Sequence, residues 1–346
     1  MKKDILMPSL LCNLLKIRYP LFQAGMVWVS GHKLAIACAK EGMLGLLGAG
    51  SMSLEILREH LEHCRSYLLE NRSDSGNIGI NIPLLYEKNK EQIDLALEYG
   101  LSIFITSAGN PKKYTAFIKE KNPKAIVGHV ISSPIQAQKA KEAGVDFVIA
   151  EGMEAGGHNA LNGLTSLVLL QHLLALNFSL PVVAAGGFFH GASLKAAFSL
   201  KASGVQLGTL FVPSKESSAH ENYKHLLLKN STPESTFLGL QQIAPVRLFK
   251  NEFSNSLLKK EQLGETKEEL LAFLGKGRAK QGMFEGDINQ GELEIGQSCS
   301  LFPLKFSQDI QHDIQNNSFP TVKEILDRLL EEYYFVAGQR DLNFFL

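Results

Sequence analysis

The chain has 346 residues, of which 45% are hydrophobic and 20% are charged. This composition is typical of a globular protein with a large core, and barrels of this length can fold as one domain. Lys and Arg total 35, as do Asp and Glu, so no overall field favours nucleic acid or a membrane surface. Cys12, Cys38, Cys64 and Cys299 are scattered and form no close pair. They exclude a disulfide framework and an iron–sulfur or zinc pattern, and they fit a reducing compartment.

The first twenty residues, MKKDILMPSLLCNLLKIRYP, contain a short apolar stretch that Pro8 and Asn13 interrupt. A signal peptide needs a longer apolar region and a small-residue cleavage site, and this segment has neither. We interpret it as a short amphipathic helix that closes the floor of the fold. No later run reaches the roughly 18 apolar residues of a membrane span. We therefore expect a cytoplasmic protein that binds neither a membrane nor nucleic acid.

Short runs rich in β-branched residues or leucine alternate with helical patterns over the first two thirds of the chain. Strands of a parallel sheet are buried on both faces, so they are continuously apolar rather than alternating. The runs span residues 20–26, 43–48, 77–82, 102–106, 125–130, 145–150, 181–186 and 204–208. Eight βα units in about 230 residues predict a closed α/β barrel, the (β/α)8 or TIM barrel, rather than an open sheet.

Helix start and stop signals fill the gaps between these runs. Ser53 is the expected N-cap of a helix with leucines at helical spacing. Pro134 stands just inside the start of a later helix, which Gly144 ends. A further helix over residues 192–203 ends at Gly204 in the same way.

The last third of the chain loses the βα rhythm. Helical patterns cover residues 267–274 and 321–335, and a glycine-rich turn region covers 275–297. Because no Pro/Ser-rich linker separates the parts, we expect a single domain. It comprises a barrel over residues 1–235 and a helical C-terminal extension over 236–346 that packs near the barrel mouth.

Glycines stand in the loops after the seventh and eighth runs, where barrel enzymes often hold phosphate. Gly186 and Gly187 follow the seventh run, and Gly208 and Thr209 follow the eighth. Glycine lets backbone N–H groups approach a phosphate oxygen, and the threonine hydroxyl adds a donor. Paired glycines can also serve only to allow tight turns. Their occurrence in both loops favours a phosphate-bearing ligand.

The segment GLLGAGS partly resembles a dinucleotide-binding fingerprint, because Gly45, Gly48 and Gly50 follow a strand and precede a helix. Ser53 stands where the third glycine belongs, and no acidic residue clearly ends the next strand. We therefore expect Gly48 and Gly50 to shape a loop over a flat ligand.

The most informative segment is AEGMEAGGHNA, residues 150–160, directly after the sixth run. Gly156 and Gly157 let the backbone press against a planar ligand, while His158 projects above it. A neutral imidazole in this place can accept a proton or hydrogen-bond an anionic substrate near neutral pH. A lone histidine is more often structural, but this setting on the functional rim favours catalysis.

Other residues at the carboxyl ends of the strands are candidates to surround the ligand at the barrel mouth. Asn81 can hydrogen-bond the edge of a flat ligand, and Trp28 offers an apolar platform at the mouth. His129 is a second candidate base, with a purely structural role as the alternative. The remaining rim candidates are Gln23, Gly25, Met26, Val27, Ser107, Ala108, Gly109 and Asn110.

Two further features of the sequence could suggest a site, and we interpret neither of them as functional. His60, His63 and His172 with Cys64 suggest a metal, but no completing ligands are evident and we expect no metal site. The lysines of residues 112–124 alternate with apolar residues, which is typical of a solvated helix face.

Eight motifs occur in the order found in nitronate monooxygenases (2-nitropropane dioxygenases) and the related flavin-dependent enoyl-ACP reductases. They are QAGMVW, GLLGAG, GINI, TSAGNP, AEGMEAGGH, VVAAGG, VQLGT and KESSAH. The chain resembles this family over nearly its whole length. The resemblance implies FMN on a barrel, with His158 as the catalytic histidine. The residues we expect to bind the cofactor are Gly25, Met26, Val27, Asn81, Glu151, Gly156, Gly157, Gly186, Gly187, Gln206, Leu207, Gly208 and Thr209.

The resemblance leaves two activities open. In a monooxygenase, FMN takes an electron from a bound nitronate and reduced flavin activates O2, while His158 hydrogen-bonds the nitro group or abstracts an α-proton. In a reductase, NADH reduces FMN, and hydride passes to an enoyl thioester on an acyl carrier protein.

The motifs divide between these branches. Trp28, the TSAGNP loop and Glu151 look like the reductase branch. The run from APVRLFKN to GELEIGQ looks like bacterial proteins grouped with the monooxygenases, and no pronounced basic patch beside the rim offers a place for an acidic carrier protein. We favour nitronate monooxygenase acting on a small molecule and O2. A non-catalytic barrel that binds a phosphate metabolite is a third alternative, and a homodimer stays open.

Overall fold

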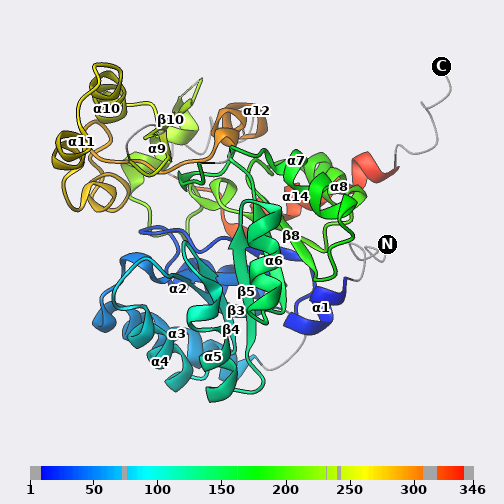
Figure 1. Ribbon diagram of the computed structural model, residues 1–346. Coiled ribbons are helices and arrows are strands. Elements are labelled where there is room, and N and C mark those ends of the chain that lie inside the picture. Colours follow the sequence, from blue (N-terminus) through cyan, green and yellow to red (C-terminus); the bar gives the residue numbers. More distant parts are fainter. Residues whose placement is uncertain are drawn as a thin grey trace.

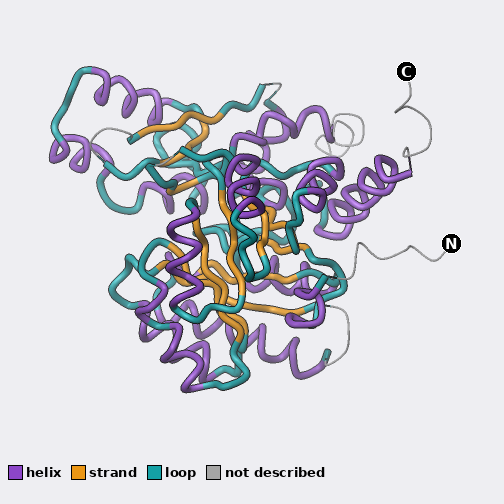
Figure 2. The backbone as a smooth tube through the Cα atoms, turned by 45° about the vertical axis from the view of Figure 1, so that its right-hand side comes forward, coloured by secondary structure: helices purple, strands orange, loops and turns teal. Residues whose placement is uncertain are grey.

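The computed structural model describes residues 9–71, 76–161, 163–230, 232–239, 243–306 and 318–338. Eight parallel strands close into a barrel in the order β1-β2-β3-β4-β5-β6-β8-β9 (Figures 1 and 2). The strands are β1 Leu21–Gln23, β2 Leu44–Gly48, β3 Asn77–Pro83, β4 Ile103–Ser107, β5 Ile126–Ile131, β6 Phe147–Glu151, β8 Val182–Ala185 and β9 Gly204–Leu207. All eight lie on the predicted runs, so the barrel is confirmed.

Helices surround the barrel, and the predicted signals at Ser53, Pro134 and Gly144 are confirmed. Ser53 Oγ accepts a hydrogen bond from the Ile56 amide, and Pro134 opens a helix that ends just before the positive-φ Gly144. The helices are α2 His32–Lys40, α3 Leu54–Glu70, α4 Asn89–Glu98, α5 Thr115–Lys121, α6 Pro134–Glu142, α7 Ser166–Ala175, α8 Gly191–Ser199 and α9 Glu221–Lys229. Helix α8 ends earlier than predicted, because residues 200–203 turn into β9.

A short helix, α1 Leu10–Leu15, plugs the amino end of the barrel as expected. Leu11 and Leu15 are fully buried in one cluster with lumen residues such as Leu44, Ile103 and Phe147. Two hydrogen bonds fix the plug: Asn77 Nδ2 donates to the Leu15 carbonyl at 2.9 Å, and Ser9 Oγ donates to the Ser203 carbonyl at 2.6 Å. We call this apolar plug and the lumen cluster the closed end of the barrel.

The C-terminal extension packs beside the barrel mouth, as expected, but it is not purely helical. Its elements are β10 Ser235–Leu238, β11 Val246–Phe249, α10 Glu252–Gln262, α11 Lys267–Leu274, a π-helix Lys280–Phe284, a 3₁₀ helix Gln297–Leu301, α12 Phe302–Phe306 and α14 Val322–Gly338. Strands β10 and β11 form an antiparallel sheet with β7 Gly157–His158, which belongs to the loop after β6. The turn prediction for residues 275–297 overlooks the π-helix.

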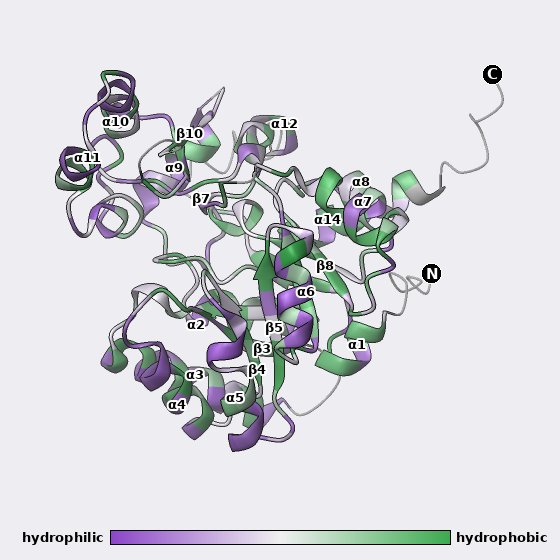
Figure 3. Ribbon diagram, viewed as in Figure 1, coloured by the Kyte–Doolittle hydropathy of each residue, from purple (hydrophilic) through white to green (hydrophobic). Residues whose placement is uncertain are grey.

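Hydropathy follows this architecture. The barrel strands are mostly apolar, whereas polar residues gather on the outer helices and on α10 and α11 (Figure 3). Helix α14 packs along α8 and returns the chain to the barrel wall. Among the described residues, no helix combines the length and apolar character needed to cross a bilayer.

Candidate active site

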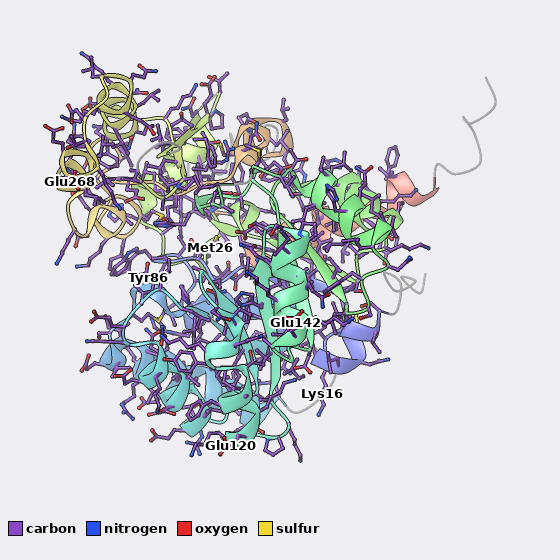
Figure 4. All side chains as sticks on the ribbon, in the orientation of Figure 1. Lys16, Met26, Tyr86, Glu120, Glu142 and Glu268 are labelled. Carbon is purple, nitrogen blue, oxygen red and sulfur yellow. The ribbon has the colours of Figure 1, made fainter. Side chains whose placement is uncertain are left out.

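A cavity of about 1220 Å³ opens at the carboxyl ends of the barrel strands. Its floor and walls come from loops after the strands, and its roof comes from the extension through Arg278, Met283, Glu292 and Glu294. Single-ligand pockets usually occupy roughly 300–1000 Å³. The cavity therefore has room for a cofactor and a substrate together. Met26 and Tyr86, labelled in Figure 4, lie where the barrel meets the extension.

The structure brings almost all the predicted site residues to this cavity. The lining includes His158 and the cofactor candidates Gly25, Met26, Val27, Asn81, Glu151, Gly156, Gly157, Gly186, Gly187, Gln206, Gly208 and Thr209. Leu207 is the exception, because its side chain is buried in the main core and is not part of the lining. It points away because neighbouring residues of a strand face opposite sides of the sheet, and Gln206 takes the inner side.

The loop after β8 has the geometry of an anion cradle. Gly186 and Gly187 have φ values of +89° and +78°, which favour glycine. A Cβ atom at Gly187 would lie 3.1 Å from Glu154 Cβ. In the described part of the chain, the amides of Gly187 and Phe188 donate to no protein acceptor, whereas the Phe189 amide donates to Ser193 Oγ at 3.2 Å. These free donors fit a phosphate group.

Two polar side chains brace this cradle. The Ser166 amide donates to Glu154 Oε2 at 2.9 Å, and Ser166 Oγ lies 2.7 Å from the Gly186 carbonyl oxygen. Across the cradle, Thr209 Oγ1 accepts from the Gly296 amide at 3.0 Å, so its own hydrogen remains available to a ligand. The loops after both final strands are thus fixed by neighbours and leave donors free.

Polar groups cap the apolar lumen directly beneath the cavity. Phe147, Ile149 and Glu151 share the inner face of β6, and only Glu151 is polar. Burial raises the pKa of its carboxyl to about 7. Gln206 Oε1 is buried without a protein partner in the described structure. Such groups fit a planar ligand whose edge carries hydrogen-bonding atoms, which is a property of the flavin ring.

Glycine also allows close packing beneath the cavity on the β1 and β2 side. A Cβ atom at Gly25 would lie 2.5 Å from Asn81 Cβ, and one at Gly45 would lie 2.0 Å from the Ala35 carbonyl oxygen. The partial dinucleotide fingerprint is therefore explained by barrel packing. Gly50 lines the cavity, as the loop interpretation expects.

His158 lies on the edge of the cavity, with 61% of its side chain exposed. Its strand β7 is held by β11, where Val246 is its partner. Its Nδ1 lies 3.5 Å from Glu294 Oε1, and this neighbour, with a smaller effect from Glu292, raises the pKa of the imidazole. The neutral imidazole expected from the sequence is therefore displaced toward the charged form.

The second candidate base, His129, has a different environment. Its Nδ1 lies 2.7 Å from Thr106 Oγ1, and the residue is buried although it borders the cavity. Burial lowers the pKa of its imidazole to about 4. His129 is therefore neutral at physiological pH and suited to a structural hydrogen bond, which favours the alternative role.

The sequence analysis missed the roof. Glu292 and Glu294 belong to the glycine-rich GELEIGQ run, which the sequence analysis treats as turns. Trp28, which adopts a left-handed φ of +61°, packs against Phe284 with ring centroids 5.8 Å apart. Together these residues cover the mouth with one apolar wall and one acidic wall. Only the alternation of Glu292, Leu293 and Glu294 could have signalled an extended segment with its carboxylates on one face.

A closed parallel barrel with an amide-lined cradle after its last two strands and a histidine at its mouth defines a (β/α)8-barrel enzyme. Residues 8–70 and 70–305 match the sequence model of the nitronate monooxygenase family. The chain belongs to this family of oxidoreductases.

Its relatives cover more than one activity. A probable nitronate monooxygenase of Staphylococcus saprophyticus is 30% identical over 284 residues, which cover 71% of this chain and 79% of that protein. A (3aS,4S,5R,7aS)-5-hydroxy-7a-methyl-1-oxo-octahydro-1H-indene-4-carboxyl-CoA dehydrogenase of Rhodococcus jostii is 31% identical, with 71% of this chain and 67% of that protein covered. Among solved structures, FabK from Thermotoga maritima superimposes with a TM-score of 0.82 at 30% identity, and the match covers 96% of this chain and 98% of FabK.

Proposed function

We propose that this protein is an FMN-dependent nitronate monooxygenase that oxidises alkyl nitronates with O2. The observation that carries the proposal is the position of His158 beside a cavity whose far side is an amide-lined phosphate cradle. Family membership supports the same activity, since relatives at 30% identity bear this name.

The residues present fit FMN. The amides of Gly187 and Phe188 and the hydroxyl of Thr209 would bind its phosphate, and Asn81, Glu151 and Gln206 would meet the ring. When bound, FMN supplies the electron transfer and the reaction with O2 that side chains lack. The chain contributes binding, orientation and exclusion of water.

The remaining cavity suits a small anion with an apolar tail. The ring nitrogen Nε2 of His158 lies on the other side of the imidazole from Glu294, so it can donate to a nitronate oxygen. Trp28 and Met283 offer apolar surface for an alkyl group. A substrate oriented in this way is held by one imidazole donor and by burial of its tail.

The alternative is an NADH-dependent enoyl-ACP reductase. The TM-score of 0.82 with FabK favours it, as does a cavity large enough for a second long ligand. The names of the relatives at 30% identity weigh against it, since two of them are nitronate monooxygenases or probable ones.

Anaerobic mixing separates the two activities. The purified protein is expected to show flavin absorbance, which bleaches on addition of propyl nitronate and stays unchanged with NADH. Rapid bleaching by NADH would overturn the monooxygenase proposal in favour of the reductase. A protein that neither carries FMN after purification nor binds added FMN would contradict both.

A further inference from the structure

The loop after β8, residues 186–190, is held at both ends, and we call it the cradle loop. Ser166 Oγ lies 2.7 Å from the Gly186 carbonyl oxygen, and Lys305 Nζ donates to the Phe189 carbonyl oxygen at 3.0 Å. A carbonyl and the amide that follows it share one planar trans peptide and point in opposite directions. The contact at Gly186 therefore fixes the direction of the next amide, which is one of the two free donors of the cradle. Both free donors lie between the two held carbonyls.

Lys305 reaches the cradle loop from α12 of the C-terminal extension, and only 3% of its side chain is exposed. Its ammonium also pairs with Glu332 of α14, with Nζ and Oε2 2.9 Å apart. The Glu332 carboxylate in turn accepts from the Gly191 amide at 2.9 Å, where the cradle loop enters α8. The ion pair therefore ties α12 and α14 to the loop and to the helix that follows it.

Two further contacts make this junction close. Helices α8 and α14 lie side by side (Figure 1), and a Cβ atom at Gly191 would lie 2.1 Å from the Tyr333 amide nitrogen. Glycine at this position thus lets the backbone of α14 reach the first turn of α8. The Phe189 ring packs edge-to-face on Phe302 of α12, with ring centroids 4.9 Å apart. The cradle loop is therefore held by residues of the extension that do not line the cavity.

We propose that Lys305 and Glu332 are positioning residues for the phosphate of the cofactor, because they fix the far end of the loop whose free amides would bind it. The inference rests on the proposed function for the identity of that ligand. The two charges cancel, and a buried ion pair is often no more stabilising than a well-packed apolar pair of the same volume. What the pair contributes is defined geometry, and donors that are fixed in advance need no ordering when a ligand binds. Its removal should weaken the phosphate contribution to affinity and leave the rest of the flavin site intact.

The test compares two flavins that differ only in the phosphate. The flavin-free full chain is titrated by fluorescence with FMN and with riboflavin, which lacks the phosphate, and the Kd for riboflavin divided by that for FMN measures the phosphate contribution. In the double variant Lys305→Met/Glu332→Leu this ratio should fall about tenfold, the size expected when one or two hydrogen bonds to a charged group lose their alignment. The Kd for riboflavin should stay within about twofold of the wild-type value, since the ring is bound by other residues.

Two single variants complete the test. Lys195→Met is the matched control, because Lys195 Nζ joins α8 to α14 by donating to the Val336 carbonyl oxygen at 2.8 Å and should leave the ratio unchanged. Gly191→Ala displaces α14 without changing a charge, because the added Cβ would meet its backbone, and the ratio should fall as in the double variant. Circular dichroism and thermal unfolding establish first that each variant is folded.

The outcomes separate this inference from the proposed function. A ratio within about twofold of wild type in either folded variant, or an equal loss of affinity for both flavins, would overturn the inference. A wild-type ratio near one would do the same, because the cradle would then contribute nothing to binding. If neither variant folds, the ion pair serves the stability of the extension and the inference also fails. In each of these cases FMN binding by the wild type leaves the proposed function standing, whereas a wild type that binds neither flavin contradicts both.

Discussion

The two ends of the barrel lumen are built from the same strands but have opposite chemistry. At the closed end, Leu11, Phe22 and Phe147 are fully buried among aliphatic side chains. Along the inner face of β6, apolar Ile149 is followed by Glu151, which lines the cavity at the open end. The closed end therefore consists of apolar contacts, whereas the open end includes polar groups without a protein partner among the described residues, such as Gln206 Oε1.

This difference separates stability from function. Apolar burial stabilises in proportion to area and needs no ligand. A half-buried carboxyl such as Glu151, or a buried amide oxygen such as Gln206 Oε1, is unfavourable until something binds it. We infer that substitutions at the closed end act on the free energy of unfolding alone, whereas those at the open end act on ligand affinity or turnover and change stability by smaller amounts.

The largest effect is expected at the closed end. Phe147 is fully buried and packs edge-to-face on Phe22 with ring centroids 5.8 Å apart. Phe147→Ala should lower the free energy of unfolding by about 3–5 kcal/mol through lost burial and a cavity, as measured by urea denaturation. Phe335→Ala, at a residue that is 68% exposed, is the control and should change it by less than about 0.5 kcal/mol. A folded Phe147→Ala protein with a markedly altered KM would contradict the separation of the two ends.

At the open end, His158→Ala is expected to act on turnover. Loss of the imidazole should reduce kcat/KM for nitronate on the order of 10²-fold, or about 2.7 kcal/mol. Flavin content and the free energy of unfolding should stay near wild-type values, because most of the side chain is exposed. His172→Ala, on the exposed face of α7, serves as the control. Full turnover in His158→Ala would remove the histidine from the mechanism.

Sequence reasoning reaches the barrel and most of the cavity lining because both depend on local signals. Each strand is a continuous apolar run, and the loop glycines lie directly after it in the sequence, as at Gly186 and Gly208. A parallel barrel brings all such ends to one side, so placing the strands also places the loops. The side chain of Leu207 lies outside the cavity lining because faces alternate along β9, which a run of neighbouring candidates does not take into account.

The roof of the cavity could not be predicted from local sequence signals. His158 and Glu294 meet only because β7 pairs with β11, and Leu248 of β11 pairs in turn with Glu294. These strands are short and come from distant parts of the chain, so no hydrophobic period marks them. The protonation state of the histidine depends on that contact. The same sequence motif therefore predicted the position of the group but not its charge.

A smaller effect is expected from Glu151→Gln in the flavin-free protein. The folded-state pKa of about 7 exceeds the unfolded value, so this carboxyl reduces stability as the pH rises from about 4.5 to 7, and the full penalty persists above pH 7. The difference in the free energy of unfolding between Glu151→Gln and wild type should be on the order of 2 kcal/mol larger at pH 8 than at pH 4.5, in favour of the variant. Glu292, with a similar shift, is present in both proteins and cancels. Parallel pH profiles for wild type, Glu151→Gln and the exposed control Glu120→Gln would show that burial does not perturb Glu151.

The smallest effect is expected at the open end, at Thr209. Its Oγ1 accepts from the Gly296 amide and so ties the loop after β9 to the chain that forms the roof of the cavity. Thr209→Val should weaken FMN binding about five- to tenfold, the value of one hydrogen bond of about 1 kcal/mol, and should cost a similar amount of stability. Thr236→Val on β10, outside the cavity lining, controls for the change of shape. If only stability falls and FMN affinity measured by fluorescence titration is unchanged, the hydroxyl supports Gly296 and does not meet the phosphate.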